Sequence, residues 1–274
     1  MTDAGSVNSL KGRVILITGG SRGLGREMAL ALAEAGAKLC ITGASDSAAL
    51  DQTAGDLGAR TGPDNVVSIA ADVADPGACN SAVAACVDRF GRVDVLINNA
   101  GLGMRVISEA FTTQPSKFWQ ADTDAWRRLV DTNTNGPFQM AKAVVPLMLE
   151  AGFGKIINVS TSDQTMVRKG YAPYGPSKAF LEAASRIWAA DLQGTGITVN
   201  VLLPGGATDT DMLPPGPGRK GADGNLLDPV IMRQPILFLA SDASNGMTGG
   251  RYIARLWDGP DAARDTSIEK PKIM

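Results

Sequence analysis

"TGGSRGLG", residues 18–25, joins the apolar run "RVILITGG" at 13–20 to a segment whose apolar residues recur at helical spacing. Gly19 permits a tight turn, while Gly23 and Gly25 let the backbone approach a pyrophosphate and let the helix pack on the sheet. The first N–H groups of the helix suit an anion. A purely structural turn would also use glycines, but the strand–turn–helix context favours a nucleotide-binding loop.

The rest of the chain alternates apolar strands with helical segments. Strands are predicted at 13–20, 38–43, 65–73, 93–101, 155–160, 197–204 and 250–255. One long helix is expected over 124–150 and another from 174 to 193, while 229–241 looks helical although Pro235 interrupts it. The sequence therefore predicts an α/β fold, a doubly wound parallel sheet of about seven strands, in a single domain spanning 1–274.

Composition excludes several classes of function. The net charge is -2 without a basic block, which argues against a nucleic-acid partner. The chain contains no histidine, so a Ser-His-Asp triad is excluded and no metal site is expected. Cys40, Cys79 and Cys86 form no paired motif, and the sequence has neither a signal region nor a membrane-spanning apolar run. We expect a cytoplasmic protein that does not bind membranes.

Two long connections break the alternation of strands and helices. Residues 102–122 form an inserted loop after the fourth strand, and residues 204–225 are rich in glycine and proline. Both follow the carboxyl end of a strand, where open α/β sheets bind ligands. We expect 102–122 to lie on the substrate side and 204–225 to act as a substrate lid.

"YGPSK", residues 174–178, offers acid–base chemistry to a chain without histidine. Tyr174 and Lys178 are four residues apart, so they share one helix face. A phenol has an ordinary pKa of ~10, and a neighbouring ammonium lowers that pKa. Such a phenol serves as a general acid or base. The alternative is a surface pair without a catalytic role.

Several motifs in order resemble the short-chain dehydrogenase/reductase family, and ketoacyl-type reductases in particular. They are "TGGSRGLG", "NNAG" at 98–101, "NTNG" at 133–136, "YGPSK" and "PGGATDTDM" at 204–212. The resemblance runs from about Lys11 to about Leu256. It implies an oxidoreductase that transfers a hydride between NADP(H) and a ketone or secondary alcohol.

The resemblance also implies four catalytic residues. Tyr174 would be the general acid or base, Lys178 would lower its pKa and hold the nicotinamide ribose, and Asn133 would support the proton relay. The family's hydroxyl donor, usually serine, falls thirteen residues before the tyrosine on Thr161. Threonine keeps the hydroxyl but adds a methyl group that restricts its rotamers. Ser162 and then Ser160 remain substitutes for Thr161.

Cofactor contacts follow from the same comparison. The expected set is Gly19, Ser21, Arg22, Gly23, Leu24, Gly25, Ser45, Asp72, Val73, Asn99, Ala100, Gly101, Tyr174, Lys178, Pro204, Gly205 and Thr208. NAD readers place an acid at the end of the second strand, but positions 43–45 have none. Arg22 and Ser45 could contact a 2′-phosphate, so NADP(H) is preferred over NAD(H). Asp46 would reverse this choice if the register shifted by one residue.

The substrate is a small carbonyl compound or alcohol on this interpretation, with contacts expected from Thr161, Gln164, Met166 and Met212. The resemblance implies a homodimer or homotetramer built on the helices at 124–150 and 174–193. Two other functions remain open. One is an epimerase, dehydratase or lyase on the same fold, and the other is a non-catalytic nucleotide-binding protein.

Overall fold

A computed structural model describes residues 10–216, 219–221 and 224–265. Seven parallel strands form one sheet in the order β3-β2-β1-β4-β5-β6-β7. Their bounds are β1 Val14–Ile17, β2 Lys38–Gly43, β3 Val66–Ala70, β4 Val95–Asn98, β5 Gly154–Val159, β6 Ile197–Leu203 and β7 Arg251–Ile253. The predicted doubly wound parallel sheet is confirmed. Its strand order reverses between β1 and β4, which makes their carboxyl ends the expected binding crevice.

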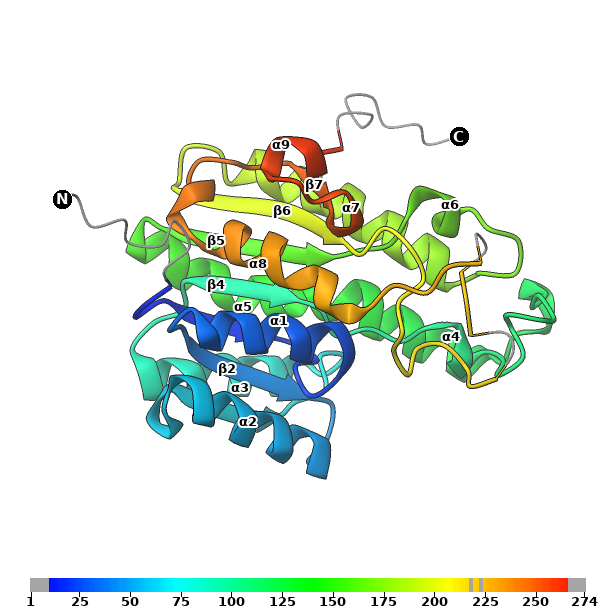
Figure 1. Cartoon of the computed structure of the whole chain (residues 1–274), viewed down its shortest axis with the longest axis horizontal. Helices are drawn as coiled ribbons and strands as arrows, with labels where there is room; N and C mark the ends of the chain where they lie inside the picture. Colours follow the sequence, from blue (N-terminus) through cyan, green and yellow to red (C-terminus); the bar gives the residue numbers. More distant parts are fainter. Residues whose placement is uncertain (1–9, 217–218, 222–223, 266–274) are drawn as a thin grey trace.

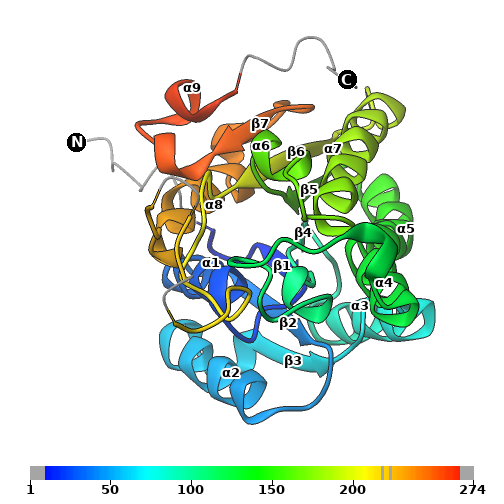
Figure 2. The same ribbon diagram turned by 90° about the vertical axis from the view of Figure 1, so that its right-hand side faces the viewer.

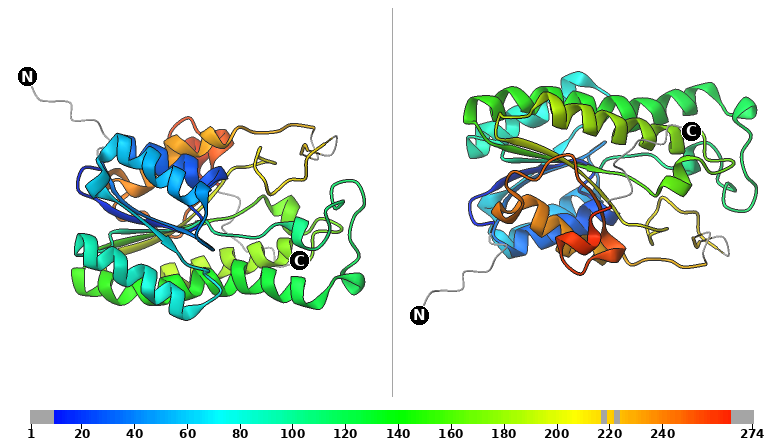
Figure 3. Two further views of the ribbon diagram at one scale, coloured as in Figure 1. Left: turned by 90° about the horizontal axis from the view of Figure 1, so that it is seen from below. Right: turned by 90° about the horizontal axis from the view of Figure 1, so that it is seen from above.

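Helices cover both faces of the sheet (Figures 1 and 3). One face carries α1 Gly23–Glu34, α2 Ala48–Thr61 and α8 Arg233–Ala240, and the other carries α3 Pro76–Phe90, α5 Gly136–Ala151 and α7 Tyr174–Asp191. Ile15 and Ile17 of β1 point into the first core, while Val14 and Leu16 point into the second. Burial on both faces explains why the strands are continuously apolar rather than alternating.

Two sequence predictions about helices need correction. The single helix expected over 124–150 consists of α4 Thr123–Val130, a π turn at Asp131–Asn135 and α5. Pro235 does not interrupt the segment at 229–241, where a 3₁₀ turn at Pro229–Met232 leads into α8. Pro235 is the third residue of α8, and the first N–H groups of a helix need no intrahelical acceptor.

Three connections lie beyond the carboxyl ends of the strands, as Figures 1 and 2 show. They are 102–122, the segment after β5 with α6 Asp163–Met166, and the described parts of 204–225. Positions 217–218 and 222–223 of the expected lid lie outside the described residues. The remaining short helices are Pro63–Asn65, Met104–Val106, Phe118–Gln120, Asp242–Ser244, Ala254–Leu256 and α9 Pro260–Ala263. Among the residues described, no helix has the length and apolarity to cross a bilayer.

Candidate active site

The glycine-rich turn leaves the start of α1 open to an anion. Gly19 and Gly23 have φ angles of 64° and 57°, a left-handed conformation that favours glycine. The side chain of Arg22 does not cap α1, and the first turn contains no acidic residue. By contrast, Ser47 caps α2 and Asp75 caps α3. The N–H groups of α1 are therefore suited to a pyrophosphate.

The turn after β1 is bonded to the turn after β4. Asn99 Nδ2 donates to the carbonyl oxygens of Thr18 and Gly19, both at 2.9 Å. Thr18 Oγ1 in turn accepts from the backbone N–H groups of Asn99 and Ala100 at 3.1 and 3.0 Å. A Cβ at Gly25 would overlap the Gly19 carbonyl and lie 2.5 Å from Asn99 Nδ2. This crossing of two turns has no room for a larger residue than glycine at position 25.

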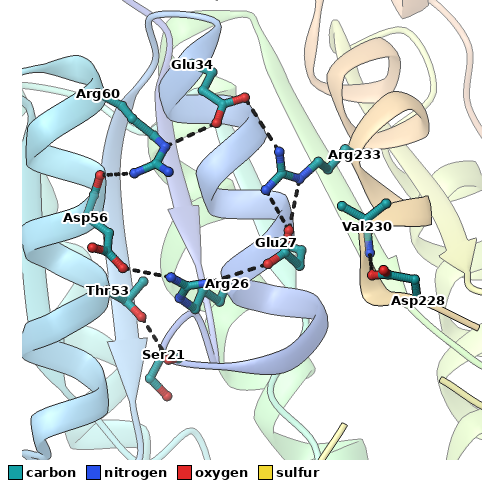
Figure 4. A network of polar contacts seen from close by, with 10 residues as sticks. All are labelled: Ser21, Arg26, Glu27, Glu34, Thr53, Asp56, Arg60, Asp228, Val230 and Arg233. Atoms are coloured by element: carbon teal, nitrogen blue, oxygen red, sulfur yellow. Dashed lines mark hydrogen bonds and ion pairs between the residues drawn. The ribbon is translucent and has the colours of Figure 1, made fainter. Parts of the chain in front are cut away.

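A polar network braces the base of the glycine-rich turn (Figure 4). Thr53 Oγ1 on α2 donates to the carbonyl of Ser21 at 2.9 Å. Ion pairs then join α1 to its neighbours: Arg26–Asp56 at 2.7 Å, Arg233–Glu27 at 2.7 Å and Arg60–Glu34 at 3.1 Å. The turn is thereby held at a fixed place relative to α2 and α8.

The other expected cofactor residues lie on the glycine-rich turn or follow the carboxyl ends of β2, β3, β4 and β6. Ser45 is exposed, and Arg22 is also exposed with its guanidinium 3.5 Å from the Asp211 carboxylate. Asp72 is exposed and accepts from the N–H of Ala74, while Val73 is buried. The remaining members lie on the glycine-rich turn, after β4 or after β6: Leu24, Gly101, Pro204, Gly205 and Thr208.

Thr161 and Tyr174 approach each other across the ends of β5 and α7. Tyr174 is the first residue of α7, and the Thr161 side chain lies beside its phenol and acts to lower the phenol pKa. Lys178, one helical turn later, is buried and donates from Nζ to the carbonyl of Val159 at 2.9 Å. A Cβ on Gly101 would lie 3.6 Å from Lys178 Nζ. Tyr174 and Lys178 thus lie on the side of α7 that faces the turn after β4, where cofactor contacts are expected.

Both flanking serines are hydrogen-bonded to other partners. Ser160 Oγ donates to Glu182 Oε1 at 2.6 Å. Ser162 caps α6 by accepting from the N–H of Thr165. Of the three neighbouring residues, Thr161 is the one whose side chain acts on the pKa of the Tyr174 phenol.

The acidity of the Tyr174 phenol differs from the sequence-based expectation. Burial raises the pKa of Tyr174 to about 12, and the neighbouring Thr161 side chain opposes this rise only in part. Burial also lowers the pKa of Lys178 to about 8, against the opposing effect of the Glu182 carboxylate. The predicted lowering of the phenol pKa by Lys178 is therefore wrong for this structure. Desolvation dominates, and the ammonium is bonded to a backbone carbonyl.

Asn133 lies in the π turn and connects the loop after β4 to α7. Its Oδ1 accepts from the N–H of Leu102 at 2.8 Å, and its Nδ2 donates to the Leu102 carbonyl at 2.9 Å and to Ser177 Oγ at 3.1 Å. Ser177 Oγ donates to the carbonyl of Tyr174 at 2.7 Å. The side chain therefore does not bond to its own helix backbone, which was the structural alternative. Instead it holds the loop and the tyrosine at a fixed separation.

The expected substrate residues are less closely grouped. Met212 reaches the loop after β4, where a Cβ on Gly103 would meet its side chain. Gln164 is exposed on α6, and the Met166 carbonyl packs beside Gly175. Of the four expected substrate contacts, Thr161 is the one whose side chain acts on the phenol of Tyr174 in the part of the chain that the structure describes.

A model of the family described as short chain dehydrogenase matches residues 13–216, which is more than half of the chain. The chain belongs to the short-chain dehydrogenase family. The matched range contains the glycine-rich turn, Asn133, Thr161, Tyr174 and Lys178. As a member of this family, the protein is an NAD(P)-dependent oxidoreductase.

Individual relatives agree with this assignment. The short chain dehydrogenase pigC of Monascus ruber is 32% identical over 272 residues, which cover 96% of this chain and 86% of pigC. The 3-oxoacyl-acyl-carrier-protein reductase FabG of Vibrio cholerae is 33% identical over 249 residues, covering 88% of this chain and 95% of FabG. A crystal structure of the Brucella melitensis 3-ketoacyl-acyl-carrier-protein reductase complexed with NADH is 29% identical with a TM-score of 0.76. It covers 89% of this chain, which in turn covers 96% of the reductase.

Sequence reasoning missed four residues that surround the site of this short-chain dehydrogenase. They are Leu102, Ser177, Glu182 and Arg251. Ser177 lies inside the quoted "YGPSK" motif, and its hydroxyl could have been singled out there. Glu182 follows Lys178 by four residues, so helical periodicity places it on the same face. No local pattern marks Arg251.

Proposed function

We propose that this short-chain dehydrogenase interconverts a ketone and a secondary alcohol with NADP(H), and that Tyr174 is its general acid and base. One arrangement carries the proposal: Tyr174 begins α7 with its phenol beside the Thr161 side chain, one helical turn from the buried Lys178. These two hydroxyls offer a substrate oxygen two donors at one point.

A bound reduced nicotinamide supplies the hydride for the carbonyl carbon. The glycine-rich turn and the start of α1 would hold its pyrophosphate, and Asn99, Ala100 and Gly101 would line its path toward Lys178. This group fits the chain because the glycines at 19 and 23 form an open cradle at an uncapped helix start.

Proton transfer is the task of the residues on α7 and β5. With a pKa of about 12, the phenol of Tyr174 is protonated at neutral pH. Thr161 holds the carbonyl oxygen by its hydroxyl while Tyr174 donates its O–H proton to that oxygen as negative charge develops. Lys178 Nζ lies one helical turn further along α7, bonded to the Val159 carbonyl, and Asn133 keeps the loop after β4 in register with Tyr174.

Three further features belong to the same proposal. We assign residues 1–274 to a single catalytic domain, with 102–122 on the substrate side and 204–225 as the lid. A homodimer or homotetramer is supported by exposed apolar side chains on α5 and α7, namely Phe138, Leu149, Phe180 and Ile187. The free cysteines Cys40, Cys79 and Cys86 suit the reducing cytoplasm.

The function is tested by mixing the enzyme with NADPH and a panel of ketones that includes a 3-oxoacyl thioester. We expect loss of nicotinamide absorbance in proportion to the alcohol formed. NADPH that stays intact while the substrate is isomerised or dehydrated would favour an epimerase, dehydratase or lyase. NADPH binding without any turnover of the panel would favour a nucleotide-binding protein without catalysis.

Cofactor preference is tested separately by Ala44→Asp. Ala44 is exposed immediately after β2, so a carboxylate there would repel a 2′-phosphate and could accept from ribose hydroxyls. We expect the ratio of kcat/KM for NADPH to that for NADH to fall by about tenfold or more, which corresponds to ~1.4 kcal/mol.

Asp46→Asn serves as the matched control for Ala44→Asp. Asp46 is the acid that would occupy the cofactor-specificity position if the register shifted by one residue, and this variant removes its charge. We expect it to leave the ratio unchanged. A large rise in NADPH preference on Asp46→Asn, with no effect of Ala44→Asp, would show that the specificity position is Asp46.

A further inference from the structure

Arg251 lies directly behind the hydroxyl donor of the proposed site. It is the first residue of β7, and its side chain is 6% exposed. Each nitrogen of the guanidinium has a different acceptor. Nε donates to the Glu182 carboxylate at 3.0 Å, Nη1 to Asp265 Oδ2 at 2.6 Å and Nη2 to the carbonyl oxygen of Thr161 at 3.0 Å.

Glu182 completes this arrangement from α7. It follows Tyr174 and Lys178 at intervals of four residues, so the three side chains lie along one helix face. Its Oε1 accepts from Ser160 Oγ at 2.6 Å as well as from Arg251. The carboxylate therefore holds both the guanidinium and the residue that precedes Thr161.

The contact with the Thr161 carbonyl bears directly on its hydroxyl. A fixed carbonyl fixes the peptide plane after Thr161 and the position of its Cα. Because Glu182 also holds Ser160 on the other side of that Cα, the chain is held on both sides of Thr161 and the direction of the Cα–Cβ bond is constrained. Because threonine is β-branched and has few χ1 rotamers, the direction of that bond largely determines where Oγ1 points. On the other side of the same residue, the hydroxyl meets Tyr174.

We propose that Arg251 is a positioning residue, which holds the Thr161 carbonyl so that the Thr161 hydroxyl faces Tyr174 and the substrate oxygen. Glu182 orients the guanidinium for this task. The inference rests on the proposed function, because it assigns Arg251 a part in the same proton-transfer site. A lysine at position 251 keeps the positive charge, but its single ammonium lacks the planar fork that reaches three acceptors at once.

The test is a double-mutant cycle on single-turnover reduction with NADPH. Thr161→Ala removes the hydroxyl, and we expect it to slow the reaction by about 100-fold. Arg251→Lys is expected to slow the reaction about tenfold in the wild-type background and less than twofold in the Thr161→Ala background. The Kd of NADPH, followed by fluorescence, should stay within about twofold of wild type throughout.

Arg13→Lys is the matched control, since Arg13 also pairs with an aspartate at 2.6 Å but precedes the central strand β1, at the amino end of the strands and away from the proposed site. We expect it to leave the single-turnover rate unchanged. Arg251→Gln, which keeps an N–H donor without the charge, repeats the cycle if Arg251→Lys unfolds below the assay temperature.

Three outcomes would overturn the inference. Equal slowing by Arg251→Lys in both backgrounds would show a general structural effect that does not act through the hydroxyl. A wild-type rate for Arg251→Lys would show that the carbonyl contact is not needed. A wild-type rate for Thr161→Ala would remove the role of the hydroxyl itself, whereas the role of Tyr174 is tested independently by its own variant.

Discussion

Tyr174→Phe is expected to lower kcat for carbonyl reduction by about a thousandfold while leaving the Kd of NADPH within about twofold of wild type. The substitution removes the phenolic hydroxyl and keeps the aromatic ring of the first residue of α7. General acid catalysis contributes ~10²- to 10⁴-fold, and the chain has no histidine to replace the phenol. Steady-state reduction rates and a fluorescence titration with NADPH measure the two quantities.

Tyr171→Phe is the matched control, because it removes a phenolic hydroxyl three residues away whose ring stacks edge-on against Phe111. Its kcat should stay within about threefold of wild type. Turnover at the wild-type rate in Tyr174→Phe would reject the assignment of the acid, whatever the result for Tyr171→Phe.

The raised pKa of Tyr174 predicts how the reaction rates depend on pH, which tests the same assignment. Reduction uses the protonated phenol, which predominates at all pH values below its pKa of about 12. Oxidation of the alcohol needs the phenolate, whose fraction rises about tenfold per pH unit below that pKa. The oxidation rate should therefore climb between about pH 6 and pH 10 while reduction stays level. A plateau of the oxidation rate near neutral pH would mean that the working phenol is far more acidic.

The sheet and its binding edge could be predicted because their signals are local. Continuous apolar strands separated by helical periods require a parallel sheet covered on both faces, and the glycine-rich turn identifies the first crossover. That Tyr174 and Lys178 share one face of α7 follows from helix geometry alone. In each case the deciding residues are neighbours in sequence or lie one helical turn apart.

The parts of the site that sequence did not predict depend on distant partners or on burial. Arg251 meets the Thr161 carbonyl across 90 positions of sequence, so no local motif connects them. The π turn around Asn133 comes from tertiary bonds to Leu102 and Ser177 rather than from helix propensity. The raised pKa of Tyr174 could not be predicted from sequence. The spacing of a tyrosine and a lysine suggests an electrostatic attraction, but it does not show how deeply the two side chains are buried and desolvated.

Gly25→Ala is expected to weaken NADPH binding by more than about 100-fold and to destabilise the fold by ~2–3 kcal/mol. The added Cβ would overlap the Gly19 carbonyl and approach Asn99 Nδ2 to 2.5 Å, at the crossing of the turns after β1 and β4. Both neighbours belong to a hydrogen-bonded turn, so the clash must be relieved by moving the backbone that forms the anion site. Fluorescence titration with NADPH and thermal unfolding measure the two effects.

Gly55→Ala is the opposite case on the same side of the sheet. Gly55 is exposed within α2, and an added Cβ meets no heavy atom within 4 Å. Alanine suits a helix interior better than glycine, so this variant should gain about 0.5–1 kcal/mol of stability without affecting NADPH binding. Because both variants add one methyl group, a difference between them comes from the position of the glycine and not from the kind of substitution. Wild-type NADPH affinity in Gly25→Ala would show that the turn can shift without losing its pyrophosphate site, and the nucleotide would then have to be held mainly by residues outside the glycine-rich stretch.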